Sequence, residues 1–303
     1  MSNIIATGFN SGSVDGELDS LEKDLRRLAG IGVDTVELAL TSLDLIAGGR
    51  IIPERADRLA KLTSQFDFRY TVHGLVSSNF MDPATCGYQL DAAKALAQLC
   101  DRIGAGILVQ HGGHLRPDQV HERADADRRE RDALHELAEF CEPYGVRIAF
   151  ENIFTAEQGQ YRQTPSQVAE TVAAVNHPNL VALIDFSHAY IEATYRGLDF
   201  RDELRAMARV AGHLHVHDSF GRPQASYKPF FVQENNALGI GDLHMPLGWG
   251  DIDWDDIFAE LEFRPDTVLM MEIGPRYRNE QPQSLERARA LMARNGKAAA
   301  RAA

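Results

Sequence analysis

Residues 146–151 read VRIAFE and residues 180–185 read LVALID, two short apolar runs that each end in an acid. Both runs are continuous rather than alternating, which is typical of strands buried on both faces of a parallel sheet. Between them, Thr164 and Pro165 suit the N-cap and the first turn of a helix. This order of strand, helix and strand predicts a parallel βαβ unit.

The same pattern extends along the whole chain. Four more apolar runs end in a possible metal ligand: FRYTVH at 68–73, ILVQH at 107–111, HLHVH at 213–217 and TVLMME at 267–272. Two further strands are expected at 4–8 and 34–40, which makes eight strand–helix units. Such repetition predicts an α/β fold, a single (β/α)8 TIM barrel. Because the carboxyl ends of all its strands open onto one face, the six ligand-bearing strand ends are expected to meet there.

The length fits one barrel domain. A chain of 303 residues allows two domains, but a (β/α)8 barrel takes about 250 residues as a single unit. We expect the barrel to cover residues 1–295 and a short flexible tail to follow at 296–303. The segment 219–250, after the seventh strand, is rich in Gly, Pro and aromatic residues. A loop of this length in a compact domain is usually functional.

The charge balance argues against nucleic acid as a partner. Acidic residues outnumber basic ones by 44 to 31, for a net charge of −13, whereas DNA-binding proteins neutralise phosphates with Lys and Arg. No apolar stretch approaches the roughly 20 residues that cross a bilayer, and the N-terminus lacks the features of a signal peptide. The three cysteines Cys86, Cys100 and Cys141 form no CxxC pair. We therefore expect a cytoplasmic protein that binds neither membrane nor nucleic acid.

Glu151, Asp185, His215 and Glu272 are the predicted metal ligands. Three carboxylates and one imidazole, without a thiolate, suit a hard or borderline divalent ion. Without an ion, three neighbouring buried acids would be destabilised by desolvation and mutual repulsion. Mn²⁺ is our first choice of cofactor, with Mg²⁺, Co²⁺ and Zn²⁺ as alternatives.

Five short motifs give the chain a specific resemblance. They are EN at 151–152, DFSH at 185–188, HVHD at 215–218, DLHMPLGWGDIDW at 242–254 and ME at 271–272. In this order the chain resembles the xylose-isomerase-like barrel superfamily, which contains sugar and cyclitol isomerases and epimerases as well as AP endonucleases of the endonuclease IV type. The resemblance covers essentially the whole chain.

This resemblance implies an activity. In keto-sugar epimerases of the superfamily, the four corresponding residues bind one divalent ion, and the two glutamates exchange a proton on opposite faces of the substrate. Glu151 and Glu272 would accordingly be both metal ligands and the catalytic base and acid, acting through an enediolate intermediate. A metal that polarises substrate oxygens, with a carboxylate in reach of the C–H bond, is consistent with that chemistry.

The resemblance also implies substrate contacts. Glu157 and His188 occupy positions that touch substrate in the epimerases, whereas the arginine of that pattern is replaced by Gly221, with Arg222 beside it. The full set of expected substrate-binding residues is His73, His111, Glu157, His188, Arg222, Asp242 and His244. The expected ligand is a small sugar-like molecule.

Two alternative activities remain open. A dehydratase or lyase would use the same enediolate but expel a leaving group, as in the similar 3-keto C-glycoside deglycosidases, which work with a small partner subunit. An AP-endonuclease-like phosphodiesterase would use the four ligands together with His73, His111, His188, Asp242 and His244 to hold three zinc ions, although the acidic charge disfavours a DNA groove. A non-catalytic barrel is a third class. We expect a homo-oligomer, with a hetero-oligomer that includes a small subunit as the alternative.

The sequence leaves the partners of two groups undecided. Glu37 either faces the pocket or pairs with an arginine. His213 and His217 alternate with His215 and so point to the same side of a strand. One of them is expected to support the metal ligand rather than to bind the metal.

Overall fold

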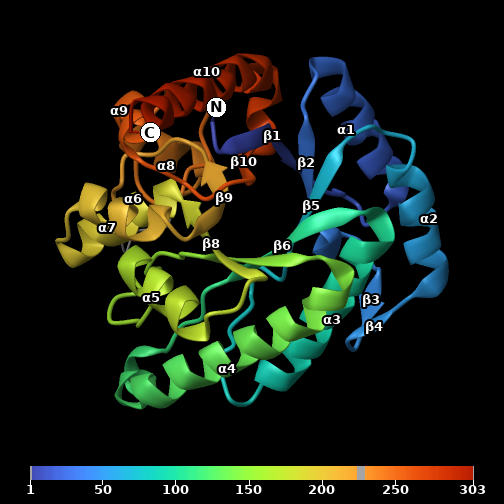
Figure 1. The fold of residues 1–303 in the computed structure, drawn as a ribbon, viewed down its shortest axis with the longest axis horizontal. Helices are drawn as coiled ribbons and strands as arrows, with labels where there is room; N and C mark the ends of the chain where they lie inside the picture. Colours follow the sequence, from blue (N-terminus) through green and yellow to red (C-terminus); the bar gives the residue numbers. More distant parts are fainter. Residues whose placement is uncertain (1, 224–228, 303) are drawn as a thin grey trace.

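The structure, a computed structural model, describes residues 2–223 and 229–302, with side chains described as far as residue 295. Eight parallel strands close into a barrel in the order β1-β10-β9-β8-β7-β6-β5-β2. Figure 1 shows these strands arranged in a ring at the centre of the molecule. The strands are β1 (Ile4–Ser11), β2 (Thr35–Leu38), β5 (Arg69–His73), β6 (Ala105–His111), β7 (Arg147–Glu151), β8 (Leu180–Asp185), β9 (Ala211–Val216) and β10 (Thr267–Met271). The predicted (β/α)8 barrel is confirmed.

The barrel closes where β1 meets its two neighbours. Gly8 pairs with Met270 of β10 and with Thr35 of β2. A Cβ atom at Gly8 would lie 1.7 Å from the carbonyl oxygen of Thr35. Only glycine therefore allows β1 and β2 to approach as they do.

Helices surround the barrel in Figure 1. They are α1 (Leu18–Ile31), α2 (Pro53–Thr63), α3 (Cys86–Ile103), α4 (Arg123–Cys141), α5 (Pro165–Val175), α6 (Phe186–Arg196), α7 (Phe200–Ala208), α8 (Val232–Leu238), α9 (Trp254–Glu260) and α10 (Gln281–Ala302). Short 3-10 turns are η1 (Leu40–Ser42), η2 (Pro117–Glu122), η3 (Glu142–Tyr144) and η4 (Pro275–Glu280). The expected cap of α5 is present, because the Thr164 side chain accepts a hydrogen bond from the Gln167 amide and Pro165 begins the helix.

Several elements differ from the sequence-based expectation. A small hairpin, β3 (Ile46–Ala47) and β4 (Arg50–Ile51), follows β2 and turns through Gly48 and Gly49, both with positive φ. Helix α6 begins directly at the end of β8, whereas the sequence predicts only a helix near residues 201–210, where the structure has α7. The backbone of α10 continues to Ala302, so residues 296–302, expected as a tail, extend this helix.

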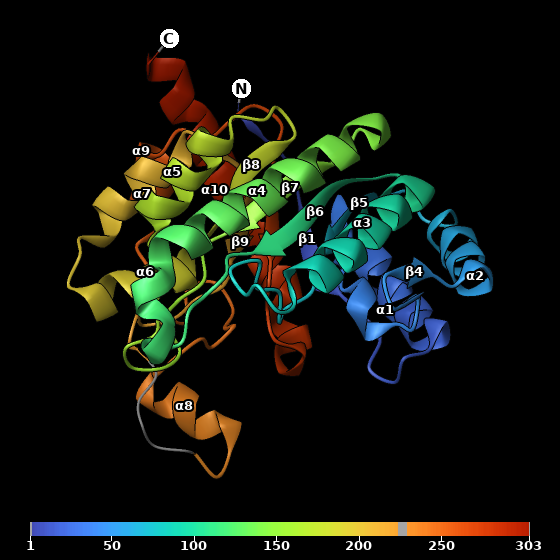
Figure 2. The same cartoon turned by 90° about the horizontal axis from the view of Figure 1, so that it is seen from below.

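The long segment after β9 contains two short helices. Figure 2 shows the first, α8, standing apart from the barrel, and α9 packs against α10. Part of the expected loop, residues 224–228, lies outside the described residues. No helix in the described ranges is both long and apolar enough to cross a membrane.

Two kinds of side chain fill the barrel interior below the strand ends. One group, here called the apolar layer, consists of Ile107, Val109, Ala149, Val181, Leu183, Val268 and Met270. The other, here called the polar layer, consists of Glu37, Thr71 and His213, all buried, in which Thr71 and His213 both hydrogen-bond to Glu37. Since side chains alternate along a strand, the residues two positions beyond the apolar layer also point inward, at the carboxyl end of the barrel. At that end, the side chains that point inward are acids and histidines.

Candidate metal centre

The strand ends place the predicted ligands next to the apolar layer. Glu151 follows Ala149 by two residues on β7, and Asp185 follows Leu183 on β8. Glu272 directly follows the end of β10 and His215 lies on β9. Because all of these strands are parallel, their side chains gather at one end of the barrel.

Glu151 lies at the centre of this group and is almost completely buried. Its Oε1 is 3.3 Å from His188 Nδ1 and 3.6 Å from His215 Nδ1. Its Oε2 is 3.2 Å from His111 Nε2 and 3.9 Å from His73 Nε2. Yet neither carboxylate oxygen has a hydrogen-bond partner among the described residues. A buried carboxylate without a hydrogen bond is costly unless a cation binds it.

His215 presents one ring nitrogen to the same space. Its Nδ1 is 3.6 Å from Glu151 Oε1 and 3.5 Å from Glu272 Oε2, and it also lacks a hydrogen-bond partner among the described residues. Glu151, Asp185 and His215 offer ligand atoms within 4.8 Å of one another. Ligand atoms bound about 2.0–2.2 Å from a common ion are spaced in this way. The residues therefore fit a divalent ion.

Asp185 is fixed from two sides. It is the N-cap of α6, where its Oδ1 accepts a hydrogen bond of 2.8 Å from the His188 amide. Its Oδ2 lies 3.0 Å from His217 Nε2. Asn152, the second residue of the EN motif, holds the Asp185 backbone by two hydrogen bonds of 3.0 Å. His217 thus supports a predicted ligand, as the sequence anticipated for one of the two flanking histidines.

A second group of titratable side chains adjoins Asp185. His244 Nε2 is 2.8 Å and His188 Nε2 is 3.4 Å from Asp242 Oδ2. The rings of His217 and His244 stack with centroids 4.2 Å apart. Asp242, His188 and His244 thus lie beside the four predicted ligands, within reach of a molecule bound there.

Histidines shift the pKa values of these acids. Burial alone would raise the pKa of Glu151, but the nearby imidazoles of His111, His188 and His215 hold it well below its usual value. Burial likewise opposes ionisation of Asp242, yet His244 and His217 hold its pKa well below the ordinary range. Burial lowers the pKa of His244, and the Asp242 carboxylate outweighs it and raises that pKa to about 10. The acids are therefore ionised, as metal binding requires.

Two expected substrate contacts lie away from the cluster. Glu157 is exposed on the loop after β7. Arg222 is also exposed, donates to the Leu238 carbonyl and lies with its guanidinium 5.5 Å from the centre of the Phe220 ring. His73 and His111, in contrast, are in the cluster, where their Nε2 atoms are 3.3 Å apart.

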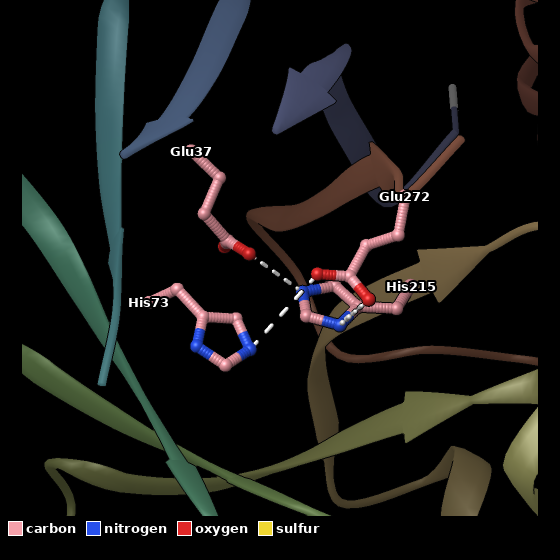
Figure 3. Close-up of side chains that lie close together, drawn as sticks. All are labelled: Glu37, His73, His215 and Glu272. Carbon is pink, nitrogen blue, oxygen red and sulfur yellow. Dashed lines mark ion pairs between the residues drawn. The ribbon is translucent and has the colours of Figure 1, made fainter. Parts of the chain in front are cut away.

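The sequence did not settle the role of Glu37, and the structure places it inside the barrel. Glu37 is fully buried, with Oε2 2.8 Å from His213 Nε2 and Oε1 2.9 Å from His215 Nε2. Figure 3 shows Glu37 directed at the Nε2 edge of the His215 ring, whereas Glu272 lies closer to Nδ1. An acid inside the apolar strand TVEL was the available signal, but its partners lie far away in the sequence.

A cavity of about 550 Å³ leads to the cluster from the loops after β1, β9 and β10. Glu272, Asp242 and His244 are among the residues that line it, together with polar residues such as Asn10 and Arg276. Sites for small molecules have volumes of roughly 300–1,000 Å³. The cavity can therefore admit a small polar substrate.

Residues 25–294 match the family described as the xylose isomerase-like TIM barrel. The chain belongs to this family. Among curated proteins, the chain is similar to MJ1311, an uncharacterised protein of Methanocaldococcus jannaschii. The two are 23% identical over 266 residues, which cover 84% of this chain and 79% of that protein.

Solved structures share the fold at low sequence identity. A D-tagatose 3-epimerase-like protein superposes with a TM-score of 0.72 at 17% identity, over 96% of this chain and 98% of that protein. D-psicose 3-epimerase of Clostridium cellulolyticum H10, solved with D-tagatose, gives a TM-score of 0.68 at 15% identity, over 95% and 99% of the two chains. These similarities show the same barrel.

Proposed function

We propose that this protein is a divalent-metal-dependent isomerase or epimerase of a sugar, keto-sugar or cyclitol. The observation that carries the proposal is the pair of acids that face one imidazole nitrogen. Glu151 Oε1 and Glu272 Oε2 lie 3.6 Å and 3.5 Å from His215 Nδ1. Two solved barrels of the same fold, named for D-tagatose and D-psicose 3-epimerase, support the choice of sugar as the substrate class.

Glu151, Asp185, His215 and Glu272 are the proposed ligands, with Mn²⁺ as the first choice and Mg²⁺, Co²⁺ or Zn²⁺ as alternatives. When bound, a divalent ion would polarise the carbonyl and hydroxyl oxygens of the substrate and acidify the adjacent C–H bond. The oxygens of Glu151 and the Nδ1 of His215, which lack hydrogen-bond partners within the described part of the chain, support this assignment.

The two glutamates are the proposed proton carriers. One carboxylate removes the proton from the carbon next to the carbonyl and leaves an enediolate, and the other glutamate returns a proton to the same or the neighbouring carbon. No electron leaves the substrate, so the reaction needs no redox cofactor. Glu151 lies on β7 and Glu272 just beyond β10, and these strands lie on either side of β9, which carries His215, in the barrel order.

The other polar residues would orient the substrate. We assign this role to His73, His111, His188, Asp242 and His244, which adjoin the cluster. Glu157 and Arg222 remain proposed contacts for the outer part of the substrate. We also retain the expectations of a cytoplasmic location and of a homo-oligomer, with a small partner subunit as the alternative.

The test is proton exchange with solvent. The Mn²⁺-loaded protein, incubated with candidate keto-sugars in D₂O, is expected to return an isomer that carries deuterium at the reacting carbon. Glu151→Gln and Glu272→Gln should each lower the rate by about 10²–10⁴-fold, because each removes a proton carrier. Full activity of both variants on a substrate that the wild type converts would refute the proposal. A smaller product would instead indicate the lyase.

The second candidate is a phosphodiesterase of the AP-endonuclease type. It is supported by the further groups His73, His111, Glu151 and Asp185, His188, His217, each of which could hold an ion. Metal analysis separates the two candidates, since about three zinc ions per chain favour the phosphodiesterase and a single Mn²⁺ or Mg²⁺ favours the sugar enzyme.

A further inference from the structure

We propose that Glu37 is a positioning residue, which fixes the proton and the direction of the metal ligand His215. This inference rests on the proposed metal centre but not on the sugar chemistry. Glu37 belongs to β2, on the other side of the barrel from β9, and its side chain crosses the interior to reach His215, as Figure 3 shows.

The surroundings of His215 differ from those of the acidic ligands. On β7, β8 and β10 the inward residue two positions before the ligand is Ala149, Leu183 or Met270, all in the apolar layer. On β9 the residue two positions before His215 is His213, which belongs to the polar layer. A buried acid and a buried histidine thus lie beneath His215 but not beneath the acidic ligands. Burying such groups costs free energy, so their retention at this one position indicates a specific role.

Each oxygen of Glu37 faces a histidine, Oε2 through hydrogen bonds and Oε1 at an ion-pair distance. Oε2 accepts hydrogen bonds of 2.8 Å from Thr71 Oγ1 and from His213 Nε2. Oε1 lies 2.9 Å from His215 Nε2, an ion-pair distance. Among the described residues, the ion pairs of Glu37 are with these two histidines, so the carboxylate has no arginine or lysine partner there.

This arrangement determines which nitrogen of His215 faces the metal. A metal-bound imidazole is neutral and carries its single proton on the nitrogen that does not bind the metal. Glu37 faces Nε2, so the proton belongs there, and the lone pair of Nδ1 points toward Glu151 and Glu272. With the proton on Nδ1 instead, the ring would block the position of the ion.

The role requires a carboxylate rather than any polar group of the same size. Three groups that can donate surround Glu37: the Thr71 hydroxyl and His213 Nε2 hydrogen-bond to Oε2, and His215 Nε2 lies at an ion-pair distance of 2.9 Å from Oε1. A carboxylate only accepts, whereas a glutamine amide has one acceptor oxygen and an NH₂ group that donates. In Glu37→Gln the NH₂ group must therefore face at least one of these donors.

The test measures metal affinity rather than activity. We expect Glu37→Gln to raise the dissociation constant for Mn²⁺ about 10–100-fold, the usual effect of losing a carboxylate behind a histidine ligand. In the Zn²⁺-loaded protein, ¹⁵N NMR of labelled histidine should show the His215 Nε2 proton in slow exchange with water in the wild type and in fast exchange in Glu37→Gln.

Matched variants separate positioning from folding. Glu203→Gln changes a buried acid that accepts from Ser166, remote from the metal ligands, and should leave the Mn²⁺ affinity unchanged. Thr71→Val removes one donor to Glu37 and should weaken Mn²⁺ binding by a few-fold, whereas Thr71→Ser should retain it. The Thr71 pair provides the same test if Glu37→Gln does not fold.

Each outcome decides a different claim. Unchanged Mn²⁺ affinity in folded Glu37→Gln, or equal affinities of Thr71→Val and Thr71→Ser where it does not fold, would overturn the positioning role alone. A wild type that binds neither Mn²⁺ nor Zn²⁺ would overturn the metal centre together with this role. Tight metal binding without sugar turnover would leave the role of Glu37 intact and refute only the proposed function.

Discussion

The two layers inside the barrel support their metal ligands in different ways. The apolar layer lies beneath Glu151, Asp185 and Glu272, whereas the polar layer of Glu37, Thr71 and His213 lies beneath His215. A carboxylate attracts a cation by its charge, so it needs only rigid packing beneath it. An imidazole binds only through the nitrogen that lacks a proton, so it also needs an acceptor at the other nitrogen. The difference indicates that the apolar layer contributes stability, whereas the polar layer orients His215 for metal binding.

The largest expected effect concerns the apolar layer. Ile107 is buried in it, four residues before His111 on β6. Ile107→Ala should lower the free energy of unfolding by about 2–5 kcal/mol, because it leaves a cavity, and Ile107→Val by about 0.5–1.5 kcal/mol. Chemical denaturation at fixed pH measures both values.

The same variants sharpen the comparison of the two layers. The Mn²⁺ affinity of Ile107→Ala should stay within a few-fold of the wild type, in contrast to the loss expected for Glu37→Gln. If Ile107→Ala weakened Mn²⁺ binding as much as Glu37→Gln, the two layers would not have separate roles.

A pH-dependent effect, smaller per pH unit than the loss expected for Ile107→Ala, is expected for a buried acid outside the barrel. Glu130 on α4 is fully buried and accepts from the Gly113 amide and from Gln163. Burial raises its pKa from 4.5 to about 8, whereas histidines lower the pKa of the buried Glu151. The folded state therefore binds the proton more tightly, and this contribution to stability is complete below pH 4.5 and is lost as the pH rises toward 8.

Glu130→Gln removes that dependence. Between pH 5 and pH 8 the free energy of unfolding of the wild type should fall, relative to that of the variant, by up to about 1.4 kcal/mol per pH unit. Denaturant midpoints measured across this range give the difference. A constant difference over the range would show that Glu130 is ionised in the folded protein.

The sequence was sufficient to predict the barrel and the residues that gather at its end. Each of those strands is a continuous apolar run, and alternation along it places its last inward residue beside the others. His73, His111, Glu151 and Asp185 all follow this rule. For such residues a local pattern and the symmetry of the fold are enough.

Partners across the barrel could not be predicted in this way. Glu37 and His213 are 176 residues apart, and nothing near Glu37 in the sequence distinguishes a histidine partner from an arginine. Helix α6 was missed because Asp185 ends a strand and caps a helix at the same residue. The outer positions, Glu157 and Arg222, depend on loop conformation, which no periodicity determines.

The central claim is that four residues from four strand ends hold one divalent ion. The most direct measurement is anomalous X-ray scattering from a crystal of the protein grown with Mn²⁺. We predict an ion about 2.0–2.3 Å from Glu151, Asp185, Glu272 and the Nδ1 of His215, with Glu37 at Nε2. An ion bound elsewhere, or bound to His215 through Nε2, would contradict the account.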